Sequence, residues 1–355
     1  MAEGTAARSW LRYRVVLYLM VGLAALDAVA AANRRIWRAY DPDDYRVKLH
    51  ECVSHPRDLV LVGGSPVSEG IDPGVLAGTP WRGRPLEDVF NLGLSGATTS
   101  EVWHAIRHGI GTPPRLLVYG ISASDINESR DEPHGPHSLM TAGDVAEWAR
   151  LRPRAAEWCV RHYARGRLER CWNLYHYRNG VRLWAADRIE SAWPGLCPQA
   201  AKEAHDGLDY SAALTRGDGY APRPGFTLGS LTHMKAIHAT PPSWSFLEKY
   251  TVGGHLCYLN KILDWGEANG VPVVLLDMPM SEELEEARYP AAFATFRAAL
   301  ADVERQRGVT VLRPTRQALG LTDDDFADLV HLNARGAARF SRWLREALSQ
   351  SEPGA

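Results

Sequence analysis

The sequence predicts an α/β protein with a doubly wound, five-stranded parallel sheet, a large helical insertion and an N-terminal transmembrane helix. Short apolar runs alternate with helical patterns after residue 50, which is typical of parallel strands connected by helices. About 150 residues separate the third and fourth of these runs, far more than an ordinary connection needs. A long apolar segment near the N-terminus is interrupted by a single charged residue, Asp27.

The predicted strands are short and apolar, and helical patterns lie between them. The expected strands are Asp58–Val62, Asp88–Leu92, Leu116–Ile121, Val271–Asp277 and Val309–Leu312. The expected helices are Thr99–Ile110, Phe246–Ala268, Ala291–Arg307 and a last helix from about Ala334 to Leu348. Asn333 is expected to cap the last helix, and Thr322 and Asp325 are expected to form a capping box shortly before it.

Three interpretations fit the apolar N-terminal segment: a membrane anchor, a cleavable signal peptide and a buried helix of a soluble protein. Val15 to Ala32 is apolar apart from Asp27, and its length just reaches the roughly 17–25 residues that span a bilayer. A cleavable signal peptide is the competing interpretation, because arginines precede a shorter apolar stretch and Ala28-Val29-Ala30 resembles a cleavage site. Arginines on both sides of the segment leave its orientation open.

Composition excludes several classes of function. The chain has 355 residues, 45% of them hydrophobic, which is enough to bury one large core. Lysine and arginine number 40 against 42 acidic residues, and no basic run marks a nucleic-acid surface, so no nucleic-acid partner is expected. The five cysteines lack C-x-x-C spacing, so they signal neither a zinc site nor a redox motif. No metal or cofactor is expected.

The segment between the third and fourth strands, residues 128–244, is predicted to be a helical insertion. Between Trp148 and Glu190 it contains ten arginines, no lysine, four acids and many aromatic residues. In one interpretation it is a helical subdomain whose aromatic side chains pack inward and whose arginines are solvated. In the other it is a cap over the functional site, where aromatic faces and guanidinium groups hold a sugar polymer or an anionic headgroup.

The first strand is followed by the most informative turn in the chain. In parallel α/β sheets, ligands collect at the carboxyl ends of the strands, so residues just after each strand are the first candidates for function. The first strand runs into Gly63-Gly64-Ser65-Pro66, where glycines allow a tight turn that exposes the Ser65 hydroxyl and Pro66 suits a first helical turn. The segment is not the nucleophile elbow G-x-S-x-G, because Val67 stands in place of the last glycine.

Three later segments supply further polar groups. The second strand precedes a glycine turn whose backbone N–H groups could face a developing oxyanion, although a plain strand-to-helix turn with a Thr cap explains the same residues. The third strand ends at Ser124 and Asp125, where the Asp could simply cap a loop. Near the C-terminus, Asp328 precedes His331 by three residues, so its carboxylate can curl back and fix the tautomer of the imidazole.

This combination of residues, in this order along the chain, resembles the SGNH hydrolase superfamily, also called GDSL esterases. The resemblance covers roughly residues 56–127 and 245–349 and implies a flavodoxin-like sheet. It implies a catalytic triad of Ser65, Asp328 and His331, with Ser65 as the nucleophile. It also implies that the backbone N–H groups of Ser65 and Gly96 bind the oxyanion, and it places Ser124 where the family has an asparagine donor.

Four segments narrow the resemblance: the apolar N-terminal segment, the run from Gly63 to Pro73, the strand end Leu276-Asp277-Met278-Pro279, and His331-Leu332-Asn333. They are similar to the anchored SGNH-like proteins that work beside membrane-bound O-acyltransferases, including those of alginate O-acetylation and lipoteichoic-acid D-alanylation. This implies a single-pass, extracytoplasmic esterase or O-acyltransferase that acts on acylated cell-envelope or extracellular glycans. Its partners would be an acylated polysaccharide or another acyl donor and a membrane-bound O-acyltransferase. The alternative is a catalytically inactive SGNH-like module for glycan binding or assembly.

The resulting domain prediction has four parts. Residues 1–38 form the membrane anchor, and residues 50–127 form the first part of the SGNH core. The arginine- and tryptophan-rich insertion follows over residues 128–244, and residues 245–350 complete the core.

Overall fold

A computed structural model of the protein describes residues 3–42, 44–129, 140–152, 156–222, 229–237 and 245–350. Parts of the predicted insertion (130–139, 153–155, 223–228 and 238–244) therefore lie outside the described residues. The described residues form two compact units. The first unit comprises the chain up to Pro42 together with Met140 and residues 161–211, and the second comprises the rest.

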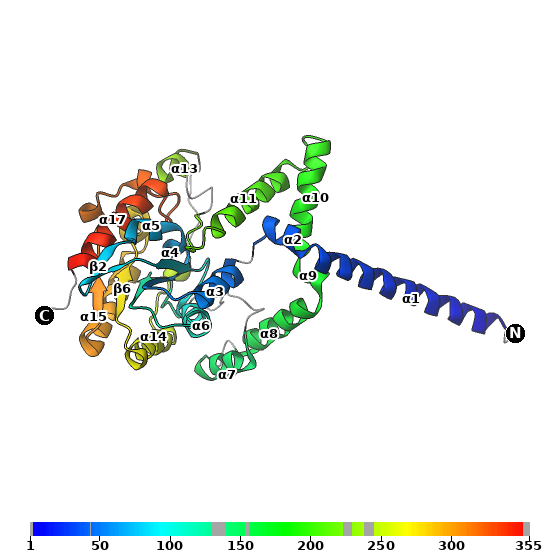
Figure 1. Cartoon of the computed structure of the whole chain (residues 1–355), viewed down its shortest axis with the longest axis horizontal. Coiled ribbons are helices and arrows are strands. Elements are labelled where there is room, and N and C mark those ends of the chain that lie inside the picture. The colour runs from blue at the N-terminus through cyan, green and yellow to red at the C-terminus, as the bar shows by residue number, and fades with distance from the viewer. Residues whose placement is uncertain are drawn as a thin grey trace. The chain divides into compact units, whose positions relative to one another are not determined.

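A five-stranded parallel sheet forms the centre of the second unit, as the sequence predicts (Figure 1). Its strands are β1 (Leu59–Gly63), β4 (Val89–Gly93), β5 (Leu116–Ile121), β6 (Val273–Asp277) and β7 (Thr310–Leu312), in the order β4-β1-β5-β6-β7. The direction of strand addition therefore reverses beside β1, which is where open α/β sheets bind their ligands. Gly63 pairs in register with both Gly93 and Gly120, so the carboxyl ends of β1, β4 and β5 lie side by side.

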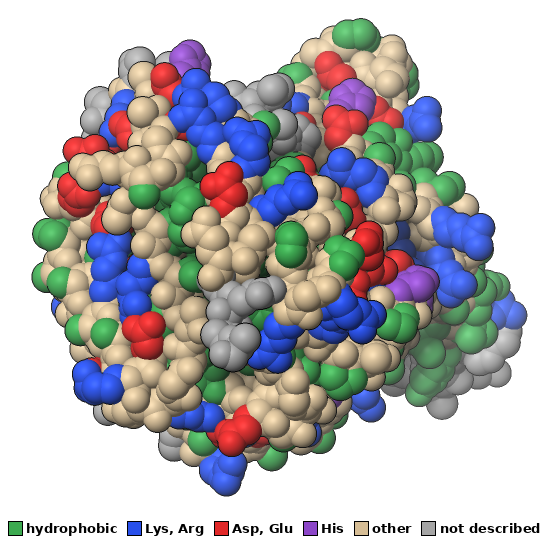
Figure 2. Space-filling view, turned by 60° about the vertical axis from the view of Figure 1, so that its left-hand side comes forward, with side chains coloured by type: hydrophobic (Ala, Val, Ile, Leu, Met, Phe, Trp, Pro, Cys, Tyr) green, Lys and Arg blue, Asp and Glu red, His purple; other side chains and the backbone are tan. Residues whose placement is uncertain are grey.

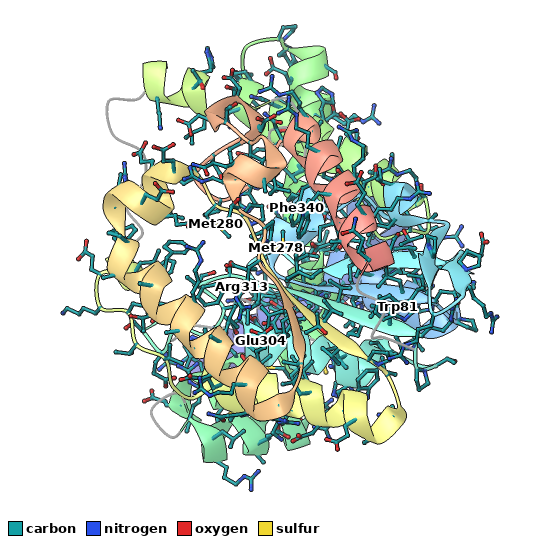
Figure 3. The ribbon with its side chains drawn as sticks, turned by 90° about the vertical axis from the view of Figure 1, so that its left-hand side faces the viewer. Trp81, Met278, Met280, Glu304, Arg313 and Phe340 are labelled. Atoms are coloured by element: carbon teal, nitrogen blue, oxygen red, sulfur yellow. The ribbon has the colours of Figure 1, made fainter. Side chains whose placement is uncertain are left out.

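Helices cover both faces of the sheet (Figure 1). On one face, α3 (Asp44–Ser54), α6 (Thr99–Gly109) and α14 (His255–Asn269) pack together. On the other, α4 (Ser65–Gly70) and α5 (Pro73–Leu76) pack against α17 (Ala334–Gln350), whose Phe340 is fully buried (Figure 3). The second unit also contains α7 (Ala142–Leu151), α13 (Leu231–Ile237), α15 (Pro290–Arg307), α16 (Arg316–Leu319), a hairpin of β2 (Thr79–Trp81) and β3 (Arg84–Leu86), 3-10 turns at Ser245–Leu247 and Asp323–Asp325, and a π-helical turn at Glu283–Arg288.

One predicted helix is wrong at its start. The sequence predicts a helix from Phe246, but α14 begins at His255 and only a 3-10 turn precedes it. Val252 forms an antiparallel bridge with Asn127, and the next residues, Gly253 and Gly254, lie against the Glu128 carboxylate. This contact between distant parts of the chain holds the segment out of a helix, and the two glycines lower its helix propensity.

The first unit is helical. It contains α1 (Glu3–Ala32), α2 (Arg34–Tyr40), α9 (Asn173–His176), α10 (Arg178–Ala192), and most of α8 (Ala156–Cys171) and α11 (Pro198–Leu214). Within α1, Tyr13–Ala32 is long and apolar enough to cross a membrane and is almost wholly exposed, although a signal sequence meets the same criteria. Asp27 accepts hydrogen bonds from the N–H of Leu174 (2.7 Å) and from the Asn173 side chain (3.1 Å), so the charge that interrupts this helix has a structural partner.

The aromatic residues of the predicted insertion have mixed environments. Trp148 and Tyr177 are each 8% exposed, as expected for inward packing, whereas Trp172 is 37% exposed and stacks on Tyr175. Arg178 lies over the Tyr175 ring at 4.1 Å from its centroid. Over the face in Figure 2, basic and acidic side chains are interspersed, in keeping with a net charge of -2.

Candidate active site

Ser65 is the first residue of α4, directly after the tight turn that ends β1. Gly64 is the N-cap of this helix and Pro66 lies in its first turn, as predicted. The helix lies close to the neighbouring strand ends, because a Cβ on Gly93 would come within 2.4 Å of the Ser68 backbone N and one on Gly120 within 2.3 Å of a Val67 methyl group. Glycines at these strand ends therefore let α4 approach the sheet and fix the position of Ser65.

Asp328 and His331 reach Ser65 from the loop before α17. His331 Nε2 is 2.8 Å from Ser65 Oγ, and His331 Nδ1 is 2.8 Å from the nearer oxygen of Asp328. When the Nδ1 proton is donated to Asp328, Nε2 is left as an acceptor for the Ser65 hydroxyl. The structure thus brings the three predicted triad residues together across 266 residues of sequence.

The Asp328 carboxylate is held ionised. Burial alone would raise the pKa of Asp328, but hydrogen bonds from His331 and from the backbone N–H groups of Val330 and His331 hold this pKa below its ordinary value. The two backbone N–H groups both donate to Asp328 Oδ1 at 2.8 Å. This local turn is the physical reason for the three-residue spacing between Asp328 and His331.

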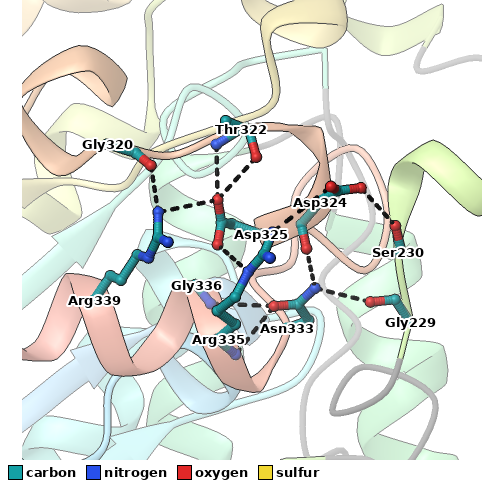
Figure 4. A network of polar contacts seen from close by, with 10 residues as sticks. All are labelled: Gly229, Ser230, Gly320, Thr322, Asp324, Asp325, Asn333, Arg335, Gly336 and Arg339. Atoms are coloured by element: carbon teal, nitrogen blue, oxygen red, sulfur yellow. Dashed lines mark hydrogen bonds and ion pairs between the residues drawn. The ribbon is translucent and has the colours of Figure 1, made fainter.

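A buried carboxylate, Asp325, anchors the loop that carries this pair (Figure 4). It accepts hydrogen bonds from the N–H and hydroxyl of Thr322, which confirms the predicted capping box, and from Arg335 Nε at 2.7 Å. Burial would raise the pKa of Asp325, but these partners hold it below its ordinary value.

Asn333 closes the other end of the loop. Its side-chain carbonyl accepts from the N–H groups of Arg335 and Gly336 in the first turn of α17, so its predicted capping role is confirmed. Its amide group donates to the carbonyls of Gly229 and Asp324. A bridge between Phe326 and Leu332 then closes the loop around the triad pair.

The turns after β4 and β5 lie beside Ser65. A Cβ on Gly64 would come within 3.2 Å of the Ala97 carbonyl oxygen and 3.7 Å of Asp125 Oδ1, so all three turns meet. Gly96 has φ +73°, a left-handed conformation that favours glycine at this turn.

Ser124 faces the same space but is already hydrogen bonded. Its hydroxyl donates to Asp125 Oδ1 at 3.2 Å and lies 2.8 Å from the Ser122 hydroxyl. The other Asp125 oxygen accepts from the Ser122 N–H at 2.7 Å, so Asp125 does cap the turn after β5. To donate to an oxyanion, the Ser124 proton must leave Asp125, and the length of that bond makes such a rotation inexpensive.

A small pocket opens at Ser65. Its volume is about 40 Å³, and Ser65, Ser122, Ser124 and Asp125 form its polar side. The remaining wall is apolar and includes Leu247, Met280, Leu284, Phe293 and Val330. Figure 3 shows Met280 just beyond the end of β6. One water molecule needs roughly 10–15 Å³ of cavity volume, so the pocket has room for a group of a few heavy atoms.

Comparison with known proteins adds no family to these observations. No protein-family model matches this chain, and no curated protein matches it in sequence. The arrangement of a serine hydroxyl, an imidazole and a carboxylate nevertheless defines what chemistry is possible, because it is the arrangement that activates a serine for nucleophilic attack.

One supporting residue of the site escapes sequence-based inference. Lys48 of α3 is 1% exposed, and its ammonium group donates to the Ser68 hydroxyl at 2.9 Å and the Gly93 carbonyl at 2.7 Å. It therefore ties α4, the helix that begins at Ser65, to the end of β4. A lysine in an otherwise ordinary helical pattern gives no local signal that it will be buried.

Proposed function

We propose that this protein is a membrane-anchored serine esterase or O-acyltransferase of the SGNH type that acts on acylated cell-envelope or extracellular glycans. The observation that carries the proposal is the continuous contact from Asp328 through His331 to Ser65, with a 2.8 Å separation at each step. The strand order, with the site at the reversal point beside β1, is compatible with SGNH winding.

In the proposed reaction, His331 takes the proton of the Ser65 hydroxyl as Oγ attacks the ester carbonyl. Asp328 stabilises the resulting imidazolium through Nδ1. The backbone N–H groups of Ser65 and Gly96, assisted by the Ser124 hydroxyl, stabilise the oxyanion. His331 then returns the proton to the leaving alcohol, and the acyl group remains on Ser65. Water or a sugar hydroxyl releases it in a second step that uses the same groups in reverse.

The pocket limits the acyl group. Its volume of about 40 Å³ and its wall of Leu247, Met280 and Phe293 favour a short acyl chain over a long one. The apolar wall also restricts water beside Ser65, which favours transfer to an oriented hydroxyl over hydrolysis.

The cellular setting belongs to the same proposal. We assign Tyr13–Ala32 as a single-pass anchor with the catalytic unit outside the cytoplasm, where acylated glycans are found. A membrane-bound O-acyltransferase is the partner that would supply the acyl group. The proposal involves no nucleic acid and no cofactor in the acyl-transfer step.

Steady-state hydrolysis of a small activated ester tests the proposal. Ser65→Ala and His331→Ala should each abolish nearly all turnover, and Asp328→Asn should reduce it somewhat less. The losses should not add in double variants, because triad members act as a unit. A fully active Ser65→Ala protein would end the proposal.

The alternative, an inactive SGNH-like module for glycan binding or assembly, is favoured by one observation. The Ser124 hydroxyl, at the family's asparagine position, donates to Asp125 and is thus withdrawn from the oxyanion. An unmodified wild-type protein that turns over no ester but binds a polysaccharide would select this alternative.

A further inference from the structure

Two histidines and one aspartate converge away from the pocket of Ser65. His104 and His108 are four residues apart on α6 and therefore lie on the same face of that helix. Asp144, in the first turn of α7, lies opposite them. One nitrogen of each imidazole and one carboxylate oxygen all lie within 4.8 Å of one another. None of these residues lines the pocket described above.

The separations between the imidazole nitrogens and the carboxylate oxygens also match those between ligands of a shared ion. His104 Nδ1 is 3.6 Å from Asp144 Oδ2, and His108 Nε2 is 3.3 Å from Asp144 Oδ1. Hydrogen bonds of this kind are normally 2.7–3.2 Å long. Two ligands of a tetrahedral ion with bonds of roughly 2.0–2.1 Å are about 3.3 Å apart. A small inward or outward adjustment of the rings would therefore complete such a site.

His104 is the buried imidazole of this cluster. It is 5% exposed, and its Nε2 atom has no hydrogen-bond partner among the described residues. Nδ1 is the His104 nitrogen that faces Asp144 and is available to an ion. The 33% exposure of the His108 side chain leaves that ion open to solvent for a water ligand.

Asp144 is oriented by Thr141, the N-cap of its own helix, and kept anionic by His104 and Thr141 together. Its Oδ2 atom accepts from the Thr141 N–H (2.8 Å) and hydroxyl (2.7 Å). Burial would raise the pKa of Asp144, but His104 and Thr141 lower it far below its ordinary value. Among the described residues, Oδ1 contacts His108 and Arg107 only. The Arg107 side chain is 44% exposed and also contacts Glu147. Arg107 can turn fully to Glu147 and leave Oδ1 to an ion.

We propose that His104, His108 and Asp144 form a binding site for a divalent transition-metal ion, with zinc as the best match. Two imidazoles and one carboxylate are a typical zinc ligand set, whereas magnesium and calcium prefer oxygen ligands throughout. Two histidines at i and i+4 on one helix face are a recurring way to present such ligands. The ion joins α7 to α6 and so fixes the start of the predicted insertion to the sheet core. This role does not depend on the acyl-transfer proposal.

The test measures metal binding by the full-length protein in detergent after EDTA treatment and dialysis. Zinc is titrated by calorimetry, and Co²⁺ is titrated in parallel because a tetrahedral cobalt site has intense visible absorption. We expect one ion per chain, the cobalt spectrum of a tetrahedral N₂O₂ site, and a higher Tm with zinc than without it.

Two single-residue variants make the test specific. His108 is exposed, so His108→Ala should fold normally and weaken zinc binding at least tenfold. The control is His205→Ala, because His205 Nε2 lies 3.3 Å from Asp187 Oδ1, the same distance as in the His108 pair. His205→Ala should bind zinc as the wild type does. The proposal is overturned if the wild type binds no stoichiometric ion, or if His108→Ala binds zinc and raises Tm as strongly as the wild type.

Discussion

Gly93 is the position where one added methyl group should disturb the site most clearly. An alanine Cβ there would lie 2.4 Å from the Ser68 backbone N and 2.8 Å from both Ser68 Cα and Asn91 Oδ1. Ordinary contacts are roughly 3.5–4.0 Å, so the overlap is about 1 Å. Two of the opposing atoms are backbone and cannot rotate away, so α4, which carries Ser65, must move.

The size of the effect follows from that overlap. Overpacking of this kind typically lowers stability by about 1–3 kcal/mol. A displacement of about 1 Å at a reacting group can lower the rate about 100-fold. We therefore expect Gly93→Ala to reduce the free energy of unfolding by about 1–3 kcal/mol and to slow turnover of a small ester by roughly 10- to 100-fold.

Urea unfolding and ester hydrolysis, measured on the same preparations, check the expected losses of unfolding free energy and of turnover. Gly143→Ala is the matched control, because its Cβ would meet only the Thr141 hydroxyl, at an ordinary 3.6 Å. That variant should keep the wild-type rate and lose no stability, since alanine is the better helix former. If Gly93→Ala also matched the wild type in both measurements, the close approach of α4 to β4 would be refuted.

Three other perturbations have defined outcomes. Ser124→Ala should lower ester turnover roughly tenfold without unfolding the protein, because it removes a hydrogen-bond donor to the oxyanion. A fully effective oxyanion donor typically contributes more than tenfold to turnover. Unchanged turnover in both Ser124→Ala and Ser124→Asn would remove this position from the site. Asp325→Asn should lower the free energy of unfolding by about 1.5–3 kcal/mol through loss of the charged hydrogen bond to Arg335, as measured in urea at pH 7. The pKa of Asp325 is lowered in the folded state, so this stabilisation is present above the unfolded pKa near 3.8 and is lost as the pH falls through the folded pKa. The difference in unfolding free energy between Asp325→Asn and the wild type should therefore shrink in acid. A difference that stays constant with pH would contradict the ion pair of Asp325 with Arg335. The anchor predicts that the protein stays in the membrane pellet after alkaline carbonate washing and is digested by external protease, whereas a mature chain that starts near Ala31 would indicate a cleaved signal peptide.

The sheet and the turn that pairs Asp328 with His331 could be predicted because their signals are local. β1, β4 and β5 are short, fully buried runs whose ends are marked by glycine or a polar residue, and β5 matches its predicted bounds of Leu116–Ile121. The Asp328 and His331 pair is defined within one turn, and Asn333 caps the helix that follows it.

The other features depend on contacts between distant segments. The start of α14 is set by the bridge from Val252 to Asn127, which no local pattern encodes. Lys48 is buried because Ser68 and Gly93 surround its ammonium group, and Asp144 meets His104 only after α7 packs on α6. Sequence spacing gives the two histidines of that cluster but not the carboxylate that faces them.

The most direct test of the central claim is to label the wild-type protein with a fluorophosphonate and map the adduct by peptide mass spectrometry. An activated serine reacts with this reagent and an ordinary one does not. We predict one adduct, on Ser65, that is absent in His331→Ala, although that variant keeps the serine. Labelling of another serine, or equal labelling of Ser65 with and without His331, would contradict the proposed triad.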